Sequence, residues 1–164
     1  MPATRSAAAF DIAGRLLAAF ETNNRINEYM IRNVPAEAWD AKPPGGKGRS
    51  IAGIVAHMHN VRLMWLKPAG AIGPLPAKIE SANLTQEGAI AALEASCRAM
   101  LAILEPALRG DGRVKGFKPD VASFCAYLFA HDAHHRGQIS MLTRQLGHPL
   151  PQSAMYGMWE WGTR

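Results

Sequence analysis

Apolar side chains recur every three or four residues along four long segments of the chain, which is the period of a helix with one buried face. In the first segment the recurring positions are Ala8, Ile12, Leu16, Ala19, Asn23, Ile26, Met30 and Val34. This pattern predicts a helix from about residue 6 to about residue 33. Pro35 follows it and is expected to stop it, because proline lacks a backbone donor and clashes with the preceding turn.

Two further helices are predicted in the middle of the sequence. Ser50 is placed as an N-cap, and the helix after it is expected to end before Pro68. Its periodic positions are Ile51, Ile54, Val55, Met58, Val61, Arg62 and Trp65. Thr85 is the expected cap of the third helix, which should kink or end at Pro106. Its buried face would comprise Ile90, Leu93, Cys97, Met100, Leu101 and Leu104.

The last long helix is predicted to begin after Asp120 and to continue for about 26 residues to Gly147, a left-handed C-cap. The segments 35–49 and 68–84 are rich in proline and glycine and are longer than a tight antiparallel hairpin needs. They therefore indicate at least one crossover along the bundle. The expected fold is an all-α four-helix bundle with long crossover connections, forming a single domain over residues 1–164.

Composition and charge narrow the classes of function. The 18 Lys and Arg residues exceed the 13 Asp and Glu residues, which gives a net charge of +5, but these charges are dispersed along the chain. They form no aromatic-interleaved stripe, so no nucleic-acid partner is expected. No apolar run approaches the ~18 residues of a membrane span, and Asp11 interrupts any signal-peptide core, so a soluble cytoplasmic protein is expected. Cys97 and Cys125 are predicted to be buried free thiols.

The chemistry is expected at three histidines. His131 and His135 are four residues apart on the fourth helix, so their rings project from one face within reach of a single ion. His57 would be the third ligand, because it lies with Ile54, Val61 and Met64 on a stripe of the second helix that we expect to face inward. Three imidazoles leave a coordination position open, as in catalytic metal sites. The alternative is that these are core or surface histidines with local hydrogen bonds.

Neighbouring polar residues receive secondary roles. His134 is offset from the pair's face and is expected in the outer shell of the site or at the surface. Gln138, one turn after His135, either orients a ligand or a water molecule, or is simply a polar residue of the interior. His59 should point away from the site, about 200° around the helix from His57. Asp132 should point off the ligand face, so no catalytic general base is identified.

Three motifs resemble the DinB/YfiT-like superfamily of metal-binding four-helix bundles. The most specific is His131-Asp132-Ala133-His134-His135-Arg136-Gly137-Gln138-Ile139. The second is Ser50-Ile51-Ala52-Gly53-Ile54-Val55-Ala56-His57, and the third is Asn23-Asn24-Arg25 with Val34-Pro35. The resemblance covers nearly the whole chain. It implies a divalent metal at His57, His131 and His135, with zinc or nickel expected, and it implies a homodimer.

The resemblance leaves two functions open. One is a metal-dependent S-transferase that joins a low-molecular-weight thiol, such as bacillithiol, mycothiol or glutathione, to a small electrophilic substrate. In that enzyme Arg136 or Arg62 would attract an anionic cofactor or substrate. The other is a non-catalytic, stress-inducible metal-binding dimeric module. The closing segment 158–161 resembles the tail of one subgroup and is expected to pack over the bundle end or across a dimer contact, or to be a plain surface tail.

Overall fold

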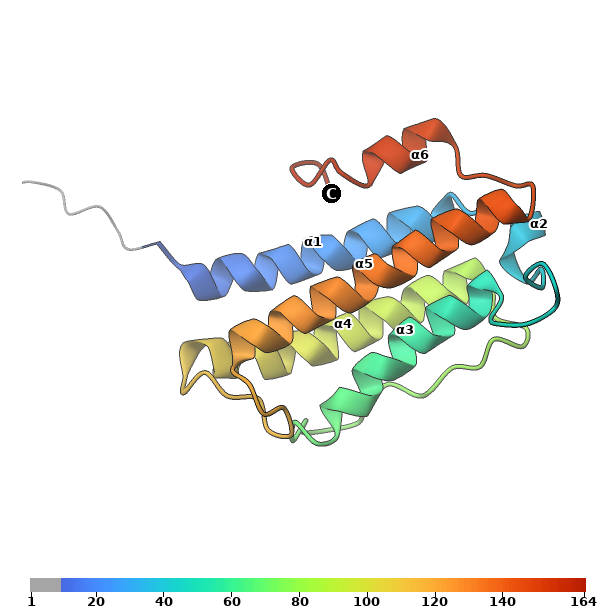
Figure 1. The fold of residues 1–164 in the computed structure, drawn as a ribbon. Coiled ribbons are helices and arrows are strands. Elements are labelled where there is room, and N and C mark those ends of the chain that lie inside the picture. Colours follow the sequence, from blue (N-terminus) through green and yellow to red (C-terminus); the bar gives the residue numbers. More distant parts are fainter. Residues whose placement is uncertain (1–9) are drawn as a thin grey trace, which may run out of the picture.

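The computed structural model describes residues 10–164, and in this range the protein is an all-helical bundle (Figure 1). The long helices are α1 (Ile12–Arg32), α3 (Ile51–Leu66), α4 (Gln86–Arg109) and α5 (Val121–Gln145), and the short ones are α2 (Ala36–Trp39) and α6 (Gln152–Gly157). An isolated bridge between Arg113 and Asp120 joins the two ends of the α4–α5 loop. The four-helix bundle fold predicted from the sequence is confirmed.

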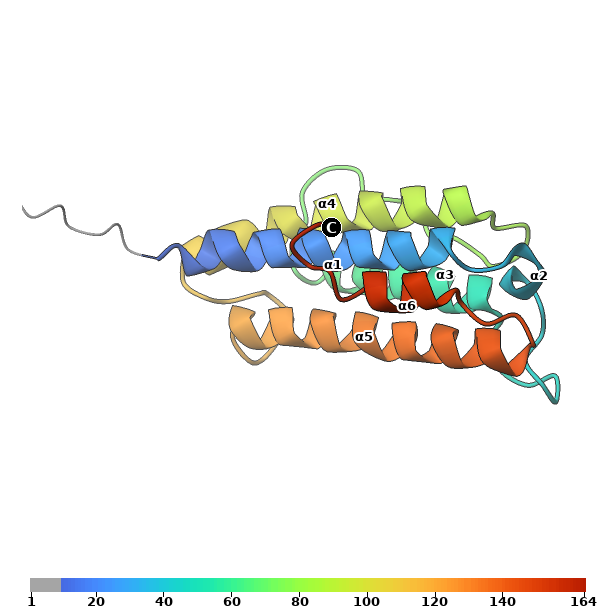
Figure 2. The same cartoon turned by 90° about the horizontal axis from the view of Figure 1, so that it is seen from above.

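The order of the helices requires one connection to travel the length of the bundle. Helices α1 and α5 run in one direction, and α3 and α4 run in the opposite one (Figures 1 and 2). Each helix of the first pair packs against α4, and α5 also packs against α3. The segment 67–85 returns from the end of α3 to the start of α4, which confirms the predicted crossover. The segment 33–50, which contains α2, stays at one end.

Side chains of α3 hold the crossover segment in place. Both ring nitrogens of His59 face backbone carbonyl oxygens, that of Ala92 on α4 at 2.8 Å and that of Ala77 in the crossover at 2.9 Å. Asn60 adds two hydrogen bonds to the backbone of Ile79, one donated and one accepted. His59 therefore points away from the histidine cluster, as expected, and serves the fold.

The caps set most helix boundaries where the sequence predicts them. Ser50, Thr85 and Asp120 each accept a hydrogen bond from the backbone N–H three residues on. Residues 6–9 of the first predicted helix lie outside the described residues. In the described part this helix begins at Ile12, because the Asp11 carboxylate caps it through the Gly14 N–H.

The structure decides what happens at Pro106 and adds one short helix that was not predicted. Helix α4 does not end at Pro106 but continues to Arg109. The proline deprives only the carbonyl of Ala102 of its donor, and this residue is exposed, so water can take the donor's place. Helix α2 was not predicted, because its single turn lies beside a proline- and glycine-rich segment. Gly147 has φ +80° directly after α5, which confirms the predicted left-handed cap.

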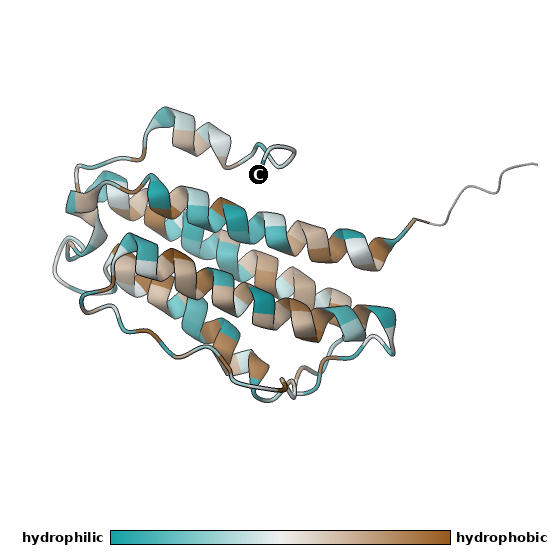
Figure 3. Ribbon diagram, turned by 180° about the vertical axis from the view of Figure 1, so that it is seen from behind, coloured by the Kyte–Doolittle hydropathy of each residue, from teal (hydrophilic) through white to brown (hydrophobic). Residues whose placement is uncertain are grey.

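The core consists of two apolar clusters, one towards each end of the bundle. One gathers around Met30, Ile51, Leu93 and Ile139, and the other around Phe20, Leu66, Met100 and Phe124. Polar side chains are buried in the middle of the long helices: Asn23, Asn24, Asn27, Arg62, Ser96 and Asp132. Hydropathy colouring shows hydrophilic segments interspersed with hydrophobic ones along the helices, and not only in the loops (Figure 3). The bundle thus carries a polar belt between two apolar halves.

The C-terminal segment lies along the side of the bundle. Figure 2 shows α6 over α1 and α5, which corrects the expectation that the tail packs over the bundle end. Trp161 packs against Phe129 of α5 at a ring-centroid distance of 6.5 Å. The Arg164 guanidinium lies 3.8 Å from the centre of the Tyr29 ring on α1. Within the described residues, no helix is both long enough and apolar enough to cross a membrane.

Candidate metal centre

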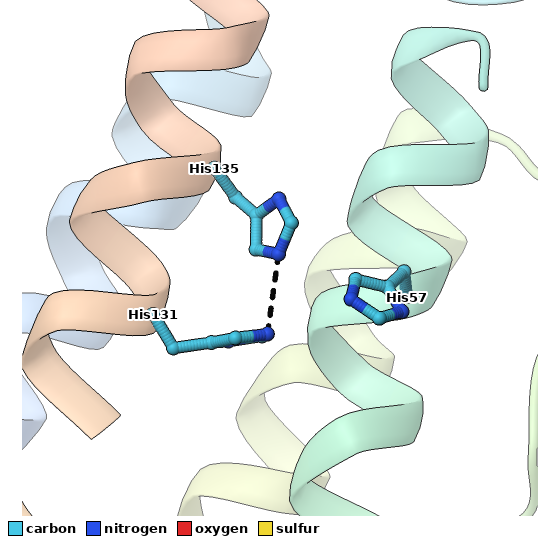
Figure 4. A group of neighbouring side chains, drawn as sticks. All are labelled: His57, His131 and His135. Atoms are coloured by element: carbon cyan, nitrogen blue, oxygen red, sulfur yellow. Dashed lines mark hydrogen bonds between the residues drawn. The ribbon is translucent and has the colours of Figure 1, made fainter. Parts of the chain in front are cut away.

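Helix α5 presents two histidine rings on one face. The helix is regular from Val121 to Gln145, so the four-residue spacing places His131 and His135 one turn apart. Their Nε2 atoms lie 3.1 Å from each other, and Figure 4 shows both rings directed towards α3. Two neutral imidazoles cannot both donate a proton across this gap. At least one of these nitrogens is therefore unprotonated, and its lone pair can accept a hydrogen bond from the other ring or bind a metal ion.

Helix α3 brings a third ring to the same place. The ring centre of His57 lies 5.5 Å from that of His131 and 4.9 Å from that of His135. Each of the three side chains offers one ring nitrogen, and these nitrogens all lie within 4.8 Å of one another. The structure thus brings together the three residues that the sequence singled out, from two helices distant in the chain (Figure 4).

One position of the stripe predicted to face inward on α3 does not do so. Met64 is 56% exposed, whereas Ile54 of the same stripe is buried, as are Met58 and Arg62 of the predicted apolar period. The helix is apolar around most of its circumference, so periodicity alone could not define its inner face. As a result His57 lies at the edge of the core and not in it, and the histidine cluster is reachable from solvent.

Burial lowers the pKa of two rings of the cluster. Desolvation is the main reason that the pKa of His135 falls to about 4; a hydrogen bond to Gln138 opposes this shift and the neighbouring histidines add to it. The pKa of His57 is lowered by desolvation, and then by the positive charge of Arg49 and by His131. Both rings are therefore unprotonated near pH 7, which is the form that binds a metal ion.

A short hydrogen-bonded chain orients His135. The Gln138 Oε1 atom accepts a hydrogen bond from His135 Nδ1 at 2.8 Å, and this fixes the proton on Nδ1. The Nε2 lone pair then faces the cluster. Gln138 Nε2 donates in turn to Nε2 of the exposed His134 at 3.0 Å. Gln138 and His134 thus stand behind His135, where the sequence predicts partners of the ligands and not ligands themselves.

Asp132 points off the ligand face, as expected, but it points into the polar belt. Its Oδ2 atom accepts hydrogen bonds from Arg62 at 2.8 Å, Asn23 at 2.7 Å and Asn27 at 2.9 Å. Its other oxygen lies 3.9 Å from Nδ1 of His131. The Arg62 charge and these hydrogen bonds hold the carboxyl pKa far below its usual range despite complete burial. An ionised carboxylate therefore stands behind the cluster without being available as a general base.

The two arginines suggested as anion-binding groups are occupied by the protein. Arg62 is 1% exposed and, besides Asp132, donates to the Asn24 side chain and to the Leu93 carbonyl. Arg136 donates to the side-chain oxygens of Asn23 and Asn27 at 2.9 and 2.6 Å. That suggestion from the sequence is therefore wrong, because both guanidinium groups close the polar belt and do not face a ligand.

Aromatic rings line one flank of the cluster. Tyr127, one turn before His131, stacks on that ring with a centroid distance of 6.0 Å. Trp65, two turns after His57 on the antiparallel helix, packs edge-on against Tyr127 at 5.7 Å and against Phe117 at 5.5 Å. Met64 adds an exposed apolar side chain on α3. This flank offers an apolar surface beside the polar ring nitrogens.

The cysteines take no part in the site. Cys97 and Cys125 are both buried and free, as predicted. Burial raises the pKa of the Cys97 thiol to about 11 and also raises that of Cys125. Neither side chain is a thiolate at neutral pH, so neither is a nucleophile or a metal ligand here.

The fold and the cluster together define a class of protein. It is a four-helix bundle in which two facing helices bring three histidines together. The chain belongs to the DinB family, whose family model matches residues 5–162. Comparison with curated proteins and with solved structures gave no match. The family model thus shows the family, and the structure shows a possible metal-binding cluster. A reaction has to be inferred from the chemistry of the site.

Proposed function

We propose that His57, His131 and His135 bind one divalent metal ion, with zinc or nickel as the preferred metals. Bonds of about 2.0–2.1 Å in a tetrahedral site require ligand nitrogens about 3.3 Å apart. The His131 and His135 nitrogens are 3.1 Å apart, and the largest separation in the cluster is 4.8 Å. Binding of one ion by all three rings would require the nitrogens to move closer together than this largest separation. The convergence of these nitrogens carries the proposal.

We further propose that the metal-loaded protein is an S-transferase that uses a low-molecular-weight thiol and a small electrophile. Three protein ligands leave a coordination position open, and the cluster is reachable from solvent. A divalent metal at this position lowers the pKa of a coordinated thiol, so that the sulfur is a nucleophile at neutral pH. The family resemblance supports this reaction over others available to an open site.

The residues of the chain have separate tasks in this proposal. Gln138 holds His135 with its Nε2 lone pair towards the cluster, and the negative charge of Asp132 supports His131 from behind. The Tyr127 and Trp65 rings give the apolar part of an electrophile a surface to lie on and keep water away from it. In the transfer the sulfur would attack the electrophilic carbon, forming a carbon–sulfur bond while the bond from that carbon to its leaving group breaks and the leaving group departs with the electron pair. The thiol proton would leave to solvent, because Asp132, the carboxylate behind the cluster, is committed to Arg62.

The proposal is tested by metal analysis of protein purified without a histidine tag, followed by conjugation assays on the metal-loaded protein. Metal-loaded protein should accelerate conjugation of an electrophile to bacillithiol, mycothiol or glutathione. His135→Ala should abolish the acceleration and leave the helical circular dichroism unchanged. A metal that raises the melting temperature without any rate above background across a broad panel would instead identify a non-catalytic metal-binding module.

A homodimer is also proposed, on the family resemblance and on two exposed aromatic side chains. Tyr156 and Trp159 of the C-terminal segment are 66% and 79% exposed. Large apolar side chains of this kind are commonly covered at subunit contacts. Light scattering of the wild type and of Trp159→Ser tests it: the wild type should have the mass of two chains and the variant a larger monomer fraction.

A further inference from the structure

A cavity of about 840 Å³ lies between the crossover segment and helix α4. Alanines form most of its floor, where Ala95, Ala99 and Ala102 recur along one stripe of α4. Crossover residues between 69 and 76 form one wall, and loop residues between 111 and 115 lie at the end where α4 finishes. Its volume is that of a pocket for a small molecule, which is roughly 300–1,000 Å³.

This cavity is separate from the histidine cluster. The crossover is attached to α3 through His59, which points about 200° away from His57 around the helix. The residues that line the cavity do not overlap with those of the cluster. The lining contains no histidine, cysteine or hydroxyl side chain. Its chemistry is therefore that of a binding site and not of a catalytic one.

The crossover wall is anchored at two points and is unpaired between them. The Ala71 N–H donates to the backbone at the end of α3, and the Ala77 carbonyl oxygen lies 2.9 Å from a ring nitrogen of His59. Within residues 10–164, the residues between these two points form no hydrogen bond. Ile72 on this wall is fully exposed, and Leu75 is 37% exposed. The wall thus presents apolar side chains that a ligand would remove from water.

Cations outnumber acids around the cavity. Arg98, Arg113 and Lys115 line it, and none of them forms an ion pair in the described part of the chain. Asp111 is the one acidic residue of the lining, and its carboxylate accepts the backbone N–H of Arg113 at 3.0 Å. Three cations against one carboxylate leave a net charge of +2. This excess favours a ligand with negative charge.

The cations stand at opposite ends of the alanine floor. Arg98 lies nine residues before Ala107, the lining residue of α4 nearest the loop, which is about 14 Å along the helix axis. Helical side chains lean towards the N-terminus, so the Arg98 side chain extends away from the loop. Arg113 and Lys115 lie on the loop itself. An apolar floor with positive charge at each end fits a ligand that is apolar in the middle and anionic at both ends.

We propose that this cavity binds a linear α,ω-dicarboxylate, with one carboxylate at Arg113 and Lys115 and the other at Arg98. The methylene chain lies on the alanine floor, against Ile72 and Leu75 of the wall. A monocarboxylate would leave one cationic end without a partner. A planar aromatic ligand would find no ring to stack on, because no aromatic side chain lines the cavity. The inference goes beyond the proposed function and does not depend on a metal.

The test is isothermal titration calorimetry of the full chain in its metal-free form, so that no carboxylate can bind to an ion. The probes are the dicarboxylates from suberate to dodecanedioate, each compared with the monocarboxylate of equal carbon number. The dicarboxylate that best spans the cavity should bind roughly fivefold more tightly than its monocarboxylate, the upper value for one exposed ion pair. The corresponding diol should bind more weakly than either acid.

Charge variants locate the two ends of the ligand. Arg98→Gln should remove the preference for the dicarboxylate and change monocarboxylate binding by less than about twofold, since a single carboxylate uses the loop end. Arg113→Gln should weaken the binding of both acids. The matched control is Lys78→Gln, which removes an exposed charge from the crossover outside the cavity lining and should change neither affinity.

A second pair of variants tests the floor. Ala99→Leu fills part of the cavity with a larger side chain that a helix accepts, and it should weaken the binding of both acids. Ala91→Leu places the same side chain at an exposed position of α4 outside the lining and should weaken neither. The helical circular dichroism of both variants should match that of the wild type.

Several results would overturn the inference. One is the absence of saturable binding for every dicarboxylate of the series. Another is equal affinity for each dicarboxylate and its monocarboxylate, which would show that only one end binds an anion. Equal losses in Lys78→Gln and Arg98→Gln would show a general effect of net charge. A preference for the dicarboxylate that survives Arg98→Gln would show that the second carboxylate lies elsewhere.

Discussion

Two clusters of polar side chains, the polar belt and the histidine cluster, lie next to each other in the bundle. They differ in how the buried polar groups find partners. In the polar belt, Asp132 is satisfied by Arg62 and two asparagines, all within the protein. In the histidine cluster, the Nε2 atoms of His131 and His135 lie within hydrogen-bond distance at 3.1 Å, and a nitrogen of His57 converges on the same place. The belt pairs its charges within the protein and leaves the Arg62 Nε atom as its one buried group without a partner among the described residues, whereas the cluster gathers three nitrogens that one metal ion can share. Polarity alone therefore does not mark a site; convergence of groups able to bind one ligand does.

The largest expected effect on stability comes from removing the Arg62 charge from the polar belt. Arg62→Met leaves the Asp132 carboxylate buried without its ion-pair partner, and we expect a loss of about 3–5 kcal/mol in the free energy of unfolding. Urea denaturation of metal-free protein measures it. The matched control is Arg109→Met, whose partners Asp11 and Glu105 are exposed, with an expected loss below about 1 kcal/mol. A similar loss in both variants would show that the belt is not the stabilising element inferred here.

As the pH falls, the two clusters should lose their contributions to the free energy of unfolding in different pH ranges. The pKa of His135 is lowered to about 4, so between pH 6.5 and 4 the unfolded chain binds more protons than the folded one. Stability of the metal-free protein should therefore fall by at most about 3 kcal/mol as the pH falls through this range. Asp132, whose pKa is also lowered, contributes stability that is lost only below its unfolded value of 3.8.

The measurement is urea denaturation at a series of pH values, with His135→Gln as the comparison variant. The variant should lose the slope between pH 6.5 and 4 that belongs to this ring, and it should keep the steeper loss below pH 4. A wild-type profile that is flat between pH 6.5 and 4 would contradict the lowered pKa and would indicate a ring already exposed to water.

Metal affinity should separate ligands from their partners. His131→Ala removes one of three ligand nitrogens and should weaken zinc binding by more than about 100-fold, the upper limit for loss of an outer partner. His134→Ala should weaken it far less, because that ring reaches the cluster only through Gln138. Chelator competition on purified apo-protein measures both affinities. Equal losses would mean that the histidines are assigned wrongly.

The smallest expected effect concerns Gln138. Gln138→Leu removes the acceptor that holds His135 Nδ1–H and should weaken metal binding by roughly tenfold. Gln138→Glu keeps an acceptor oxygen in place and should retain the wild-type affinity or exceed it. Loss of affinity in Gln138→Glu equal to that in Gln138→Leu would show that shape, and not the hydrogen bond, is what position 138 supplies.

The histidine cluster was predictable because its geometry is local. The His131–His135 spacing fixes two rings on one turn of helix whatever the rest of the fold does. His57 required only that two helices face each other, although one position of the stripe chosen for it, Met64, is exposed. The conclusion survived because a ring at the edge of the core still reaches across to α5.

The polar belt could not be assembled from the sequence in the same way. Asn23 and Arg62 both fall on positions of the apolar period, and this was the available signal that polar groups are buried there. Their partner Asp132 lies far away in the chain, on another helix. Pairing them depends on the rotation of each helix about its axis, which the period of a largely apolar helix such as α3 does not determine.

The placement of the histidines also affects when the protein can acquire its metal during synthesis. His57 leaves the ribosome well before His131 and His135, and the helices that carry them are separated by the long crossover and α4. A nascent chain that ends within α4 offers only one imidazole of the cluster, that of His57, and lacks the other two ligands. Loading must therefore wait until α5 has docked against α3, and the bound ion then fastens the last long helix to a partner made much earlier.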